Sequence, residues 1–348
     1  MTKEALLGEG YKFDAGTFPA ALNANQKEAR RVFLDEIHAK GRYATVDNCP
    51  FCGASDFIKI SERDAKGLPC EIVVCSACGA CFKGKILDHD ANRYHYERIS
   101  YSLRGKDRSR DASEGLFKMR VKTFAYPRYS FIRHFAGLKP ERDLVAEFGS
   151  GDGANLVPWN REGFDSVGIE FDPETVKFGR DKGLDLVQGD FMTYEFRDRK
   201  PKLVILSHLL EHVSDVNAVL RRIHSVLDPQ GYLFIEVPGI KGQGLGKPLL
   251  SFDVEHNYYF DLDTLKGALN RNSFEMVYGD EFIRILCKPR NSSVPAAGVK
   301  TAHHHSLLPL LQKAEKGSIG IKLVNRFNSL YFGIYYNLLS LGAKHDRM

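Results

Sequence analysis

The sequence predicts an α/β protein whose main domain is a doubly wound sheet of seven strands, parallel except for an antiparallel hairpin at one edge. Two observations support this prediction. Between residues 144 and 237, apolar runs of strand length alternate with stretches of helical periodicity, which is typical of parallel strands joined by right-handed helical crossovers. Before this region, four cysteines lie in two Cys-x-x-Cys pairs, which indicates a small additional module.

The main domain is expected to contain five buried strands with helices between them, followed by one more helix and the hairpin. We expect the five strands at residues 144–148, 167–171, 186–188, 203–206 and 232–237, and the helices at 154–162, 173–182 and 215–227. The further helix is expected at 263–270 and the hairpin at 274–277 and 282–287. Helical periodicity also occurs near residues 25–40 and at 116–135.

The composition is that of an ordinary globular protein. The chain has 348 residues, of which 43% are hydrophobic and 27% charged. Its formal net charge of +5 permits a phosphate-bearing partner but is modest for a nucleic-acid-binding protein. The first thirty residues lack the apolar core of a secretory signal, and no run of eighteen apolar residues occurs, so we expect a cytoplasmic protein without a transmembrane span.

The two Cys-x-x-Cys pairs predict a metal site. Cys49 and Cys52 are followed by a glycine, as are Cys75 and Cys78, and such a knuckle directs two thiolates to one ion. Four thiolates complete a tetrahedral site, so we expect a structural zinc ion in a zinc-ribbon-like module. Cys70 and Cys81 are expected to be small buried side chains. Whether either of them joins the metal site stays open at this level.

A strand, a glycine-rich turn and a helix follow one another from Val145 onward. The turn carries Glu147, Gly149, Gly151 and Gly153, and glycines allow the backbone to approach a ligand closely. Glu170 ends the second strand and Asp190 follows the third. Acids at the carboxyl ends of three adjacent strands converge at one edge of the sheet, where they favour a positively charged ligand with a ribose over a pyrophosphate.

Residues 143–240 resemble the class I S-adenosylmethionine-dependent methyltransferases, a Rossmann-like family. The resemblance covers the glycine turn, the strand-end acids, the segment Leu210-Glu211-His212-Val213 and the turn Asp228-Pro-Gln-Gly231. It implies that Glu147 and the three glycines hold the methionine part of the cofactor, Glu170 the ribose and Asp190 the adenine. Phe171 and Phe191 are then neighbours of the adenine ring, and Ser207 and His208 open onto the pocket. For His212 the resemblance implies an orienting role more than direct chemistry.

A second resemblance concerns the segment Glu255-His256-Asn-Tyr258-Tyr259-Phe260. Together with the cysteine knuckles, it resembles methyltransferases of bacterial polysaccharide and deoxysugar pathways over residues 46–290. This resemblance implies that Glu255 and His256 lie at the substrate and that His256 is the general base. Histidine suits this role because it can accept a proton near neutral pH.

The resemblance also implies a carbohydrate substrate, such as a nucleotide-linked sugar or a glycan. Relatives that methylate carbon carry a longer carboxyl-terminal domain, so we expect methylation of a sugar hydroxyl, with carbon as the alternative acceptor. The sequence also permits an RNA methyltransferase, or a protein that binds S-adenosylmethionine without catalysis. The segment after the fourth strand lacks the Asn-Pro-Pro-Tyr and Pro-Cys sequences used for base methylation, which disfavours RNA.

Ten lysines and arginines lie between Arg98 and Arg133, with tyrosines among them. They predict either a solvated helix face or a substrate wall. The candidate substrate contacts are His208, Tyr126, Arg128, Tyr258 and Tyr259. Near the carboxyl terminus, apolar residues from Phe327 to Leu339 recur at helical spacing. This stripe predicts a helix that packs on the chain itself, on a second copy in a homodimer, or peripherally on a membrane.

These patterns divide the chain into five segments, each with its own expected role. They are a helical segment at 1–45, the zinc-binding module at 46–88, a connector or helical lid at 89–135, the methyltransferase domain at 136–290 and a helical tail at 291–348.

Overall fold

The predicted seven-stranded sheet is present in the computed structural model, which describes residues 2–16, 21–105, 110–196, 199–242, 248–290 and 307–317. Its strands are β7 (Leu144–Phe148), β8 (Asp165–Glu170), β9 (Leu186–Gln188), β10 (Leu203–Ser207), β11 (Tyr232–Glu236), β13 (Phe274–Gly279) and β14 (Arg284–Pro289). Their order across the sheet is β13-β14-β11-β10-β7-β8-β9. Strands β7 to β11 are parallel, and β14 is antiparallel to both of its neighbours. The α/β fold class is therefore confirmed.

Helices cover both faces of this sheet because successive strand residues point to opposite sides. On one face, Val145 of β7 packs with residues of α5 (Tyr126–Phe135) and α6 (Val157–Arg161). On the other face, Ala146 of the same strand belongs to the core shared with α8 (Val216–Val226) and α10 (Leu262–Arg271). Further helices are α4 (Arg110–Arg120) and α7 (Pro173–Arg180), which contribute Phe117 and Val176 to a third apolar cluster.

The hairpin at the sheet edge begins its second strand two residues later than predicted. Asp280 accepts hydrogen bonds from the backbone N–H groups of Phe282 and Arg284, at 3.0 and 3.3 Å. Ile283 lies in the left-handed region, with a φ of 57°. This turn occupies residues 280–283, so β14 starts only at Arg284.

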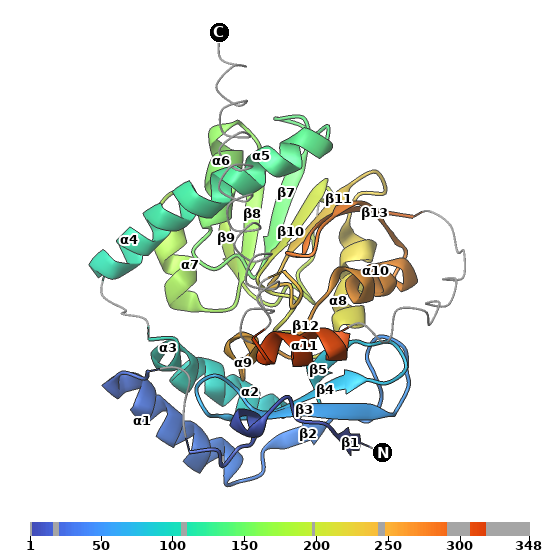
Figure 1. Cartoon of the computed structure of the whole chain (residues 1–348). Coiled ribbons are helices and arrows are strands. Elements are labelled where there is room, and N and C mark those ends of the chain that lie inside the picture. The colour runs from blue at the N-terminus through green and yellow to red at the C-terminus, as the bar shows by residue number, and fades with distance from the viewer. Residues whose placement is uncertain are drawn as a thin grey trace.

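A second sheet of five strands contains most of the cysteine-rich module. Its strands are β1 (Thr2–Glu4), β3 (Phe57–Arg63), β4 (Pro69–Cys75), β5 (Cys81–Lys83) and β12 (Tyr258–Tyr259), in the order β1-β3-β4-β5-β12. Strand β12 follows the main sheet's fifth strand in sequence, yet it pairs antiparallel with β5. A separate pair joins β2 (Tyr43–Thr45) to β6 (Lys85–Leu87). Figure 1 shows this second sheet below the main one, with β12 close to α11.

The helices before the main sheet are continued or joined by π-helical turns. Helix α1 (Ala24–Phe33) continues through such a turn at Leu34–His38. Another turn, at His95–Ile99, joins α2 (His89–Tyr94) to α3 (Ser100–Leu103). Phe33 and Ile37 are fully buried in a small core with Leu68, which lies between β3 and β4. Helix α4 likewise leads into α5 through a turn at Val121–Ala125, as the periodicity of residues 116–135 predicted.

Two short helices complete the described part of the chain. Helix α9 (Pro248–Ser251) precedes β12, and α11 (Leu307–Glu315) packs in a cluster with Tyr11 and Phe252. The apolar stripe predicted between residues 327 and 339 lies outside the described residues. Among the helices that the structure describes, none has the length and apolar character needed to cross a lipid bilayer.

Phe82 of β5 provides a test of how the two sheets depend on each other. It is 1% exposed, lies edge-on to Phe57 at a centroid distance of 5.2 Å and belongs to the core shared with the main sheet. We expect Phe82→Ala to lower the free energy of unfolding by about 3–5 kcal/mol. Phe124→Ala, at a 42% exposed position, should cost less than about 1 kcal/mol. Urea denaturation of both variants measures this, and equal effects would contradict the shared core.

Candidate active site and metal centre

The glycine turn after β7 has the backbone geometry of a ligand loop. Gly149, Gly151 and Gly153 all have positive φ values, of 64°, 54° and 76°. A Cβ atom at Gly149 would come within 2.8 Å of Leu209, and one at Gly153 within 2.8 Å of Leu184. At Gly151 a Cβ would meet no atom within 4 Å, so this part of the loop faces open space. The loop can therefore receive a ligand against its backbone at Gly151.

Glu170 lies at the end of β8 beside this loop. Its carboxylate accepts hydrogen bonds from the backbone N–H groups of Gly151, Phe171 and Asp172, at 2.9, 2.7 and 3.0 Å. The Phe171 ring is 62% exposed, which leaves its face free to stack on a flat ligand ring. These contacts place two of the predicted cofactor residues next to the glycine turn.

The next two strands bring further predicted residues to the same edge. Asp190 follows β9, and its side chain accepts the N–H of Met192 at 2.8 Å. Phe191 stacks on Phe148 of β7, with centroids 5.2 Å apart and planes 20° from parallel. Ser207 is the last residue of β10 and is partly exposed.

Glu147 of β7 is buried at 1% exposure beneath the glycine turn. One carboxylate oxygen accepts a hydrogen bond from Asn155 at 2.6 Å, and the other is buried without a partner among the described residues. Burial raises the pKa of Glu147 to about 8. This orphaned oxygen fits a ligand that brings a hydrogen-bond donor or a positive charge.

A chain of polar contacts leads from Glu147 to the end of β11. Asn155 accepts a hydrogen bond from Arg128 at 2.9 Å, and Arg128 in turn donates two hydrogen bonds to Glu236. His208 lies at the far end of this chain, with its Nε2 atom 3.8 Å from Glu236. The predicted substrate contact Arg128 is therefore an internal link, 8% exposed, between the glycine turn and His208.

Three histidines and a carboxylate gather after β10. Glu211 is 1% exposed, and the imidazoles of His208 and His212 lie 3.4 and 3.8 Å from its Oε1 atom. The rings of His212 and His256 lie 4.9 Å apart at 72°. Burial lowers the pKa of His256 to about 4, which keeps this imidazole neutral at neutral pH. His208, which is half exposed, has a φ of 54°, an uncommon backbone conformation for a non-glycine residue.

Asn257 holds the two segments of this histidine cluster together. Its backbone N–H donates to the carbonyl of Glu211 at 2.7 Å. Its side-chain amide donates to the carbonyls of His212 and Val213 at 3.0 and 3.1 Å. The Nδ1 atom of His212 lies 2.9 Å from the carbonyl oxygen of Glu255. Because these bonds cross between the segments in both directions, His212 and His256 are held side by side.

The carboxylate of Glu255 points to the helices before the main sheet and not to the His256 ring. It lies 3.0 Å from His95 Nε2 and accepts a hydrogen bond from Arg104 Nε at 2.6 Å. Although burial acts to raise its pKa, hydrogen bonding to His95 and the charge of Arg104 hold that pKa well below the usual range. Tyr96, between these residues in sequence, has its hydroxyl 3.3 Å from His212.

The three tyrosines predicted as substrate contacts have partners within the protein. Tyr258 donates to the carbonyl of Ser214 at 2.7 Å, and Tyr259 to that of Asp253 at 3.0 Å. Both are buried in β12, where they stabilise the strand pairing. The hydroxyl of Tyr126 accepts a hydrogen bond from Arg161 at 3.1 Å. Among the predicted substrate contacts, His208 is thus the one that the structure places within the histidine cluster.

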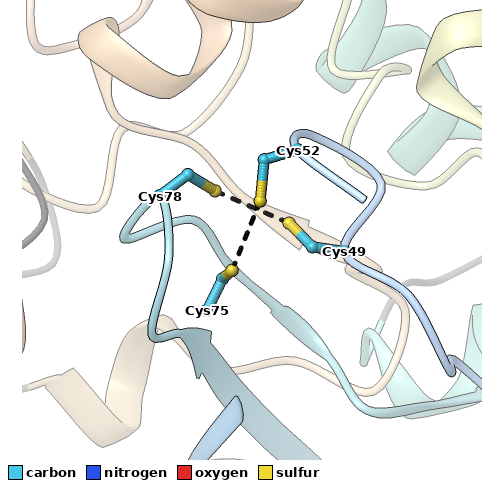
Figure 2. Close-up of side chains that lie close together, drawn as sticks. All are labelled: Cys49, Cys52, Cys75 and Cys78. Carbon is cyan, nitrogen blue, oxygen red and sulfur yellow. Dashed lines mark hydrogen bonds between the residues drawn. The ribbon is translucent and has the colours of Figure 1, made fainter. Parts of the chain in front are cut away.

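The four predicted metal ligands lie together (Figure 2). The Sγ atoms of Cys49 and Cys78 are 3.5 Å apart, and those of Cys52 and Cys75 are 3.6 Å apart. Four sulfurs about 2.3 Å from one zinc ion would lie about 3.8 Å apart, so the cluster is compatible with tetrahedral zinc. Cys70 and Cys81 pack in another apolar cluster, outside this group of ligands.

The two knuckles share one backbone geometry. The N–H groups of Gly53 and Gly79 each donate to the carbonyl of the first cysteine of their knuckle, Cys49 or Cys75, at 2.9 Å. Both glycines have positive φ, at 79° and 73°. The proximity of Cys75 and Cys78 raises the pKa of the Cys49 thiol. A bound cation would favour the thiolates, because metal ligands must be deprotonated.

Comparisons with known proteins agree with this geometry. A family model described as a methyltransferase domain matches residues 122–278. The matched residues, a little under half of the chain, are thus similar to a methyltransferase domain. Its fold is that of the class I S-adenosylmethionine-dependent methyltransferases, in agreement with the strand order described above. The open backbone at Gly151, the orphaned oxygen of Glu147 and the exposed ring of Phe171 fit that cofactor.

One curated relative is the C-methyltransferase NovU of Streptomyces niveus, which is 24% identical over 254 residues. The match covers 67% of this chain and 57% of the relative, so the chain spans little more than half of that protein's length. Solved structures similar to the methyltransferase domain include a S-adenosylmethionine-dependent methyltransferase from Archaeoglobus fulgidus (21% identity, TM-score 0.39, covering 48% of this chain and 78% of that one). Another is DesVI of Streptomyces venezuelae (15% identity, TM-score 0.41, covering 51% of this chain and 97% of that one).

Several residues around the methyltransferase site are not predictable from the sequence. Glu211 belongs to a segment of the family resemblance, but nothing in the sequence marks it as a member of the site. His95, Arg104 and Asn257 have no distinguishing sequence pattern, because their roles depend on partners more than forty positions away. Asn155 lies only eight residues after Glu147, and a polar side chain on the first turn after the glycines could have indicated its contact.

The raised pKa of Glu147 predicts how stability varies with pH. In the unfolded chain this carboxyl ionises near its ordinary value of 4.5, whereas in the folded chain it keeps its proton up to about pH 8. Its contribution to the free energy of unfolding is therefore fully present below pH 4.5 and is lost as the pH rises toward 8. Glu147→Gln should be more stable than the wild type at about pH 8 by a few kcal/mol, at about 1.4 kcal/mol per pKa unit, and equally stable at about pH 4.

Urea denaturation of both proteins at several pH values measures this difference. Glu275→Gln, which replaces an exposed carboxylate on β13, serves as the control and should follow the wild type. A stability difference between Glu147→Gln and the wild type that does not change with pH would contradict the assignment.

Proposed function

We propose that this protein transfers the methyl group of S-adenosylmethionine to a hydroxyl group of a carbohydrate. One observation carries the chemical part of this proposal. Two imidazoles, of His212 and His256, are held beside the buried Glu211 in the segment after β10, and Leu209 of that segment lies against Gly149 of the glycine turn. The carbohydrate itself is inferred from the resemblance of the Glu255-His256 segment and the cysteine knuckles to sugar methyltransferases.

The cofactor would lie along the carboxyl ends of β7, β8 and β9. Glu147 and the glycines at 149, 151 and 153 would hold its methionine part, and Glu170 would hold its ribose. Asp190 would contact the adenine, with Phe171 and Phe191 against the ring and Ser207 at the mouth of the pocket. When bound, the cofactor supplies a methyl carbon attached to a positively charged sulfur, which a nucleophile attacks in line.

His256 is the residue proposed to take the acceptor's proton. A sugar hydroxyl is a weak nucleophile, so its proton must leave as the new bond forms. Hydrogen bonds with the side-chain amide of Asn257 and the carbonyl of Glu255 hold His212 against the His256 ring, and the Glu255 carboxylate anchors the segment through His95 and Arg104. His208, half exposed at the rim of the cluster, is the proposed contact with the carbohydrate.

The second candidate acceptor is carbon. The curated relative that matches 67% of this chain is named a C-methyltransferase, which favours methylation of a carbon atom next to a carbonyl group. The same cluster could remove a proton from such a carbon. Nuclear magnetic resonance of the product made from carbon-13-methyl-labelled cofactor and carbon-13-labelled sugar separates the two, because only a C-methyl group shows one-bond coupling to a sugar carbon.

Replacement of His256 tests the proton-removal step. With a panel of nucleotide-linked sugars, His256→Ala should lower kcat by about 10²–10⁴-fold, because a general base contributes an acceleration of this size. His134→Ala, which removes an exposed imidazole from α5, is the matched control and should retain wild-type turnover. Calorimetry should show unchanged cofactor binding in both variants. Full turnover by His256→Ala would rule out the assigned base, and a lack of cofactor binding by the wild type would rule out the enzyme.

We further propose that Cys49, Cys52, Cys75 and Cys78 bind one structural zinc ion. The test is replacement of zinc by Co²⁺, which gives a thiolate-to-metal charge-transfer absorption only at a cysteine site. Cys52→Ala should lose this absorption and unfold at a lower temperature, because metal binding supplies part of the folding free energy of such a module. Cys70→Ala, at a buried cysteine outside the group, should keep the absorption. Loss in both variants, or in neither, would contradict the ligand assignment.

A further inference from the structure

We infer that Glu211, His212 and His256 bind one divalent first-row transition-metal ion, at a site distinct from the four cysteines. One ligand atom of each residue lies within 4.8 Å of the others, the only such group besides the cysteines within the described part of the chain. Ligands about 2.1 Å from one ion lie roughly 3–3.5 Å apart. A small inward movement of the side chains would therefore complete the coordination.

The orientation of His212 is that of a metal ligand. Its Nδ1 atom lies 2.9 Å from the carbonyl oxygen of Glu255, so Nδ1 carries the proton and donates it to that oxygen. The lone pair is then on Nε2, the atom that faces Glu211 Oε1 at 3.8 Å. Metal-bound histidines usually donate their other ring N–H to a carbonyl or carboxylate in this way, which fixes the tautomer and the ring direction.

Glu211 is the second, independent indication of a cation. Both of its carboxylate oxygens are buried, and neither has a hydrogen-bond partner among the described residues. Burying a carboxylate without compensation is costly, so such groups are normally paired or bound to a metal. The cationic side chains of Arg104 and Arg128 are engaged with other carboxylates, those of Glu255 and Glu236. The groups that face Glu211 are imidazoles, which can be ligands of the same ion.

The ligand set indicates the kind of metal. Two imidazoles and one carboxylate suit Mn²⁺, Fe²⁺, Co²⁺ or Zn²⁺, whereas Mg²⁺ prefers an all-oxygen environment and thiolate sites prefer zinc. Three protein ligands leave coordination positions open for water or for a substrate oxygen. The half-exposed His208, whose Nδ1 atom lies 3.4 Å from Glu211, marks the side on which the site meets solvent.

The role of this ion rests on the proposed function. A hydroxyl group bound to a divalent cation has a lowered pKa, so an ion here would ease loss of the acceptor's proton. The two roles of His256 exclude each other. Without this ion His256 takes the acceptor's proton, whereas with the ion bound His256 is a ligand and the proton of the bound hydroxyl would leave to a water molecule. Either acceptor would offer the ion an oxygen atom, the hydroxyl oxygen in one case and the neighbouring carbonyl oxygen in the other.

Manganese titration of the full-length protein, prepared with one zinc ion per chain so that only the cysteine site is filled, tests the inference without reference to activity. The electron paramagnetic resonance signal of free Mn²⁺ disappears as the ion binds. We expect one Mn²⁺ per wild-type chain, and binding weaker by about tenfold or more in Glu211→Gln and in His256→Ala. His134→Ala should bind like the wild type. Equal zinc content and equal thermal unfolding in the wild type and the three variants would show that the fold is retained.

Each outcome decides the matter. The absence of saturable Mn²⁺ binding by the wild type, or binding by both cluster variants equal to that of the wild type, would overturn the site. A second measurement separates this inference from the proposed function, namely carbohydrate methylation before and after a chelator that leaves the zinc content unchanged. Mn²⁺ binding without methylation would retain the site and remove the proposed function. Methylation that is unaffected by the chelator, together with no Mn²⁺ binding, would retain the proposed function and remove the site.

Discussion

The bonding of residues 252–258 to both halves of the molecule is the constraint on which the site depends. On one side, the side chain of Lys83, in β5, donates a hydrogen bond to the carbonyl of Val254 at 2.7 Å. The carboxylate of Asp64, which follows β3, accepts a hydrogen bond from the Val254 N–H at 3.2 Å. On the other side, Asn257 bonds to the turn that follows β10. Between these anchors lies His256. Its position against His212 therefore follows from two sets of hydrogen bonds between side chains and backbone groups, and not from contacts of its own ring alone.

This arrangement gives the cysteine-rich module a structural link to the chemistry. Strand β5 connects the second knuckle to the histidine segment, since it begins three residues after Cys78 and pairs with β12. Phe51, within the first knuckle, packs edge-on against Tyr258 and Phe260 at 5.7 and 6.1 Å. A metal that fixes the knuckles thus also fixes the strand that follows His256. A zinc ion bound there would not need to approach the reacting atoms to have this effect, because the effect would be transmitted through strand pairing and packing.

Ionisable groups are buried around the site, which lowers the stability of the fold unless their polar atoms find partners. Asp64 and Lys83 are buried in the second sheet, Glu147 lies under the glycine turn, and Glu211 lies under the histidines. Removing such charges from water is unfavourable unless each finds a partner. Glu255 has two partners in His95 and Arg104, whereas Glu147 and Glu211 keep orphaned oxygens. These two carboxylates are those that face the proposed cofactor and the proposed cation.

The sequence by itself determined the features that depend on local spacing. The alternation of apolar runs predicted the strands and helices, the knuckle spacing predicted which four cysteines gather, and the glycine turn predicted the positive φ values after β7. Only the tertiary structure decided how distant segments meet. The insertion of β14 between β11 and β13, the pairing of β12 with β5 and the approach of His212 to His256 join residues far apart in the chain. Periodicity reports which face of an element is buried but not which partner covers it, and for that reason these contacts could not be inferred from the sequence.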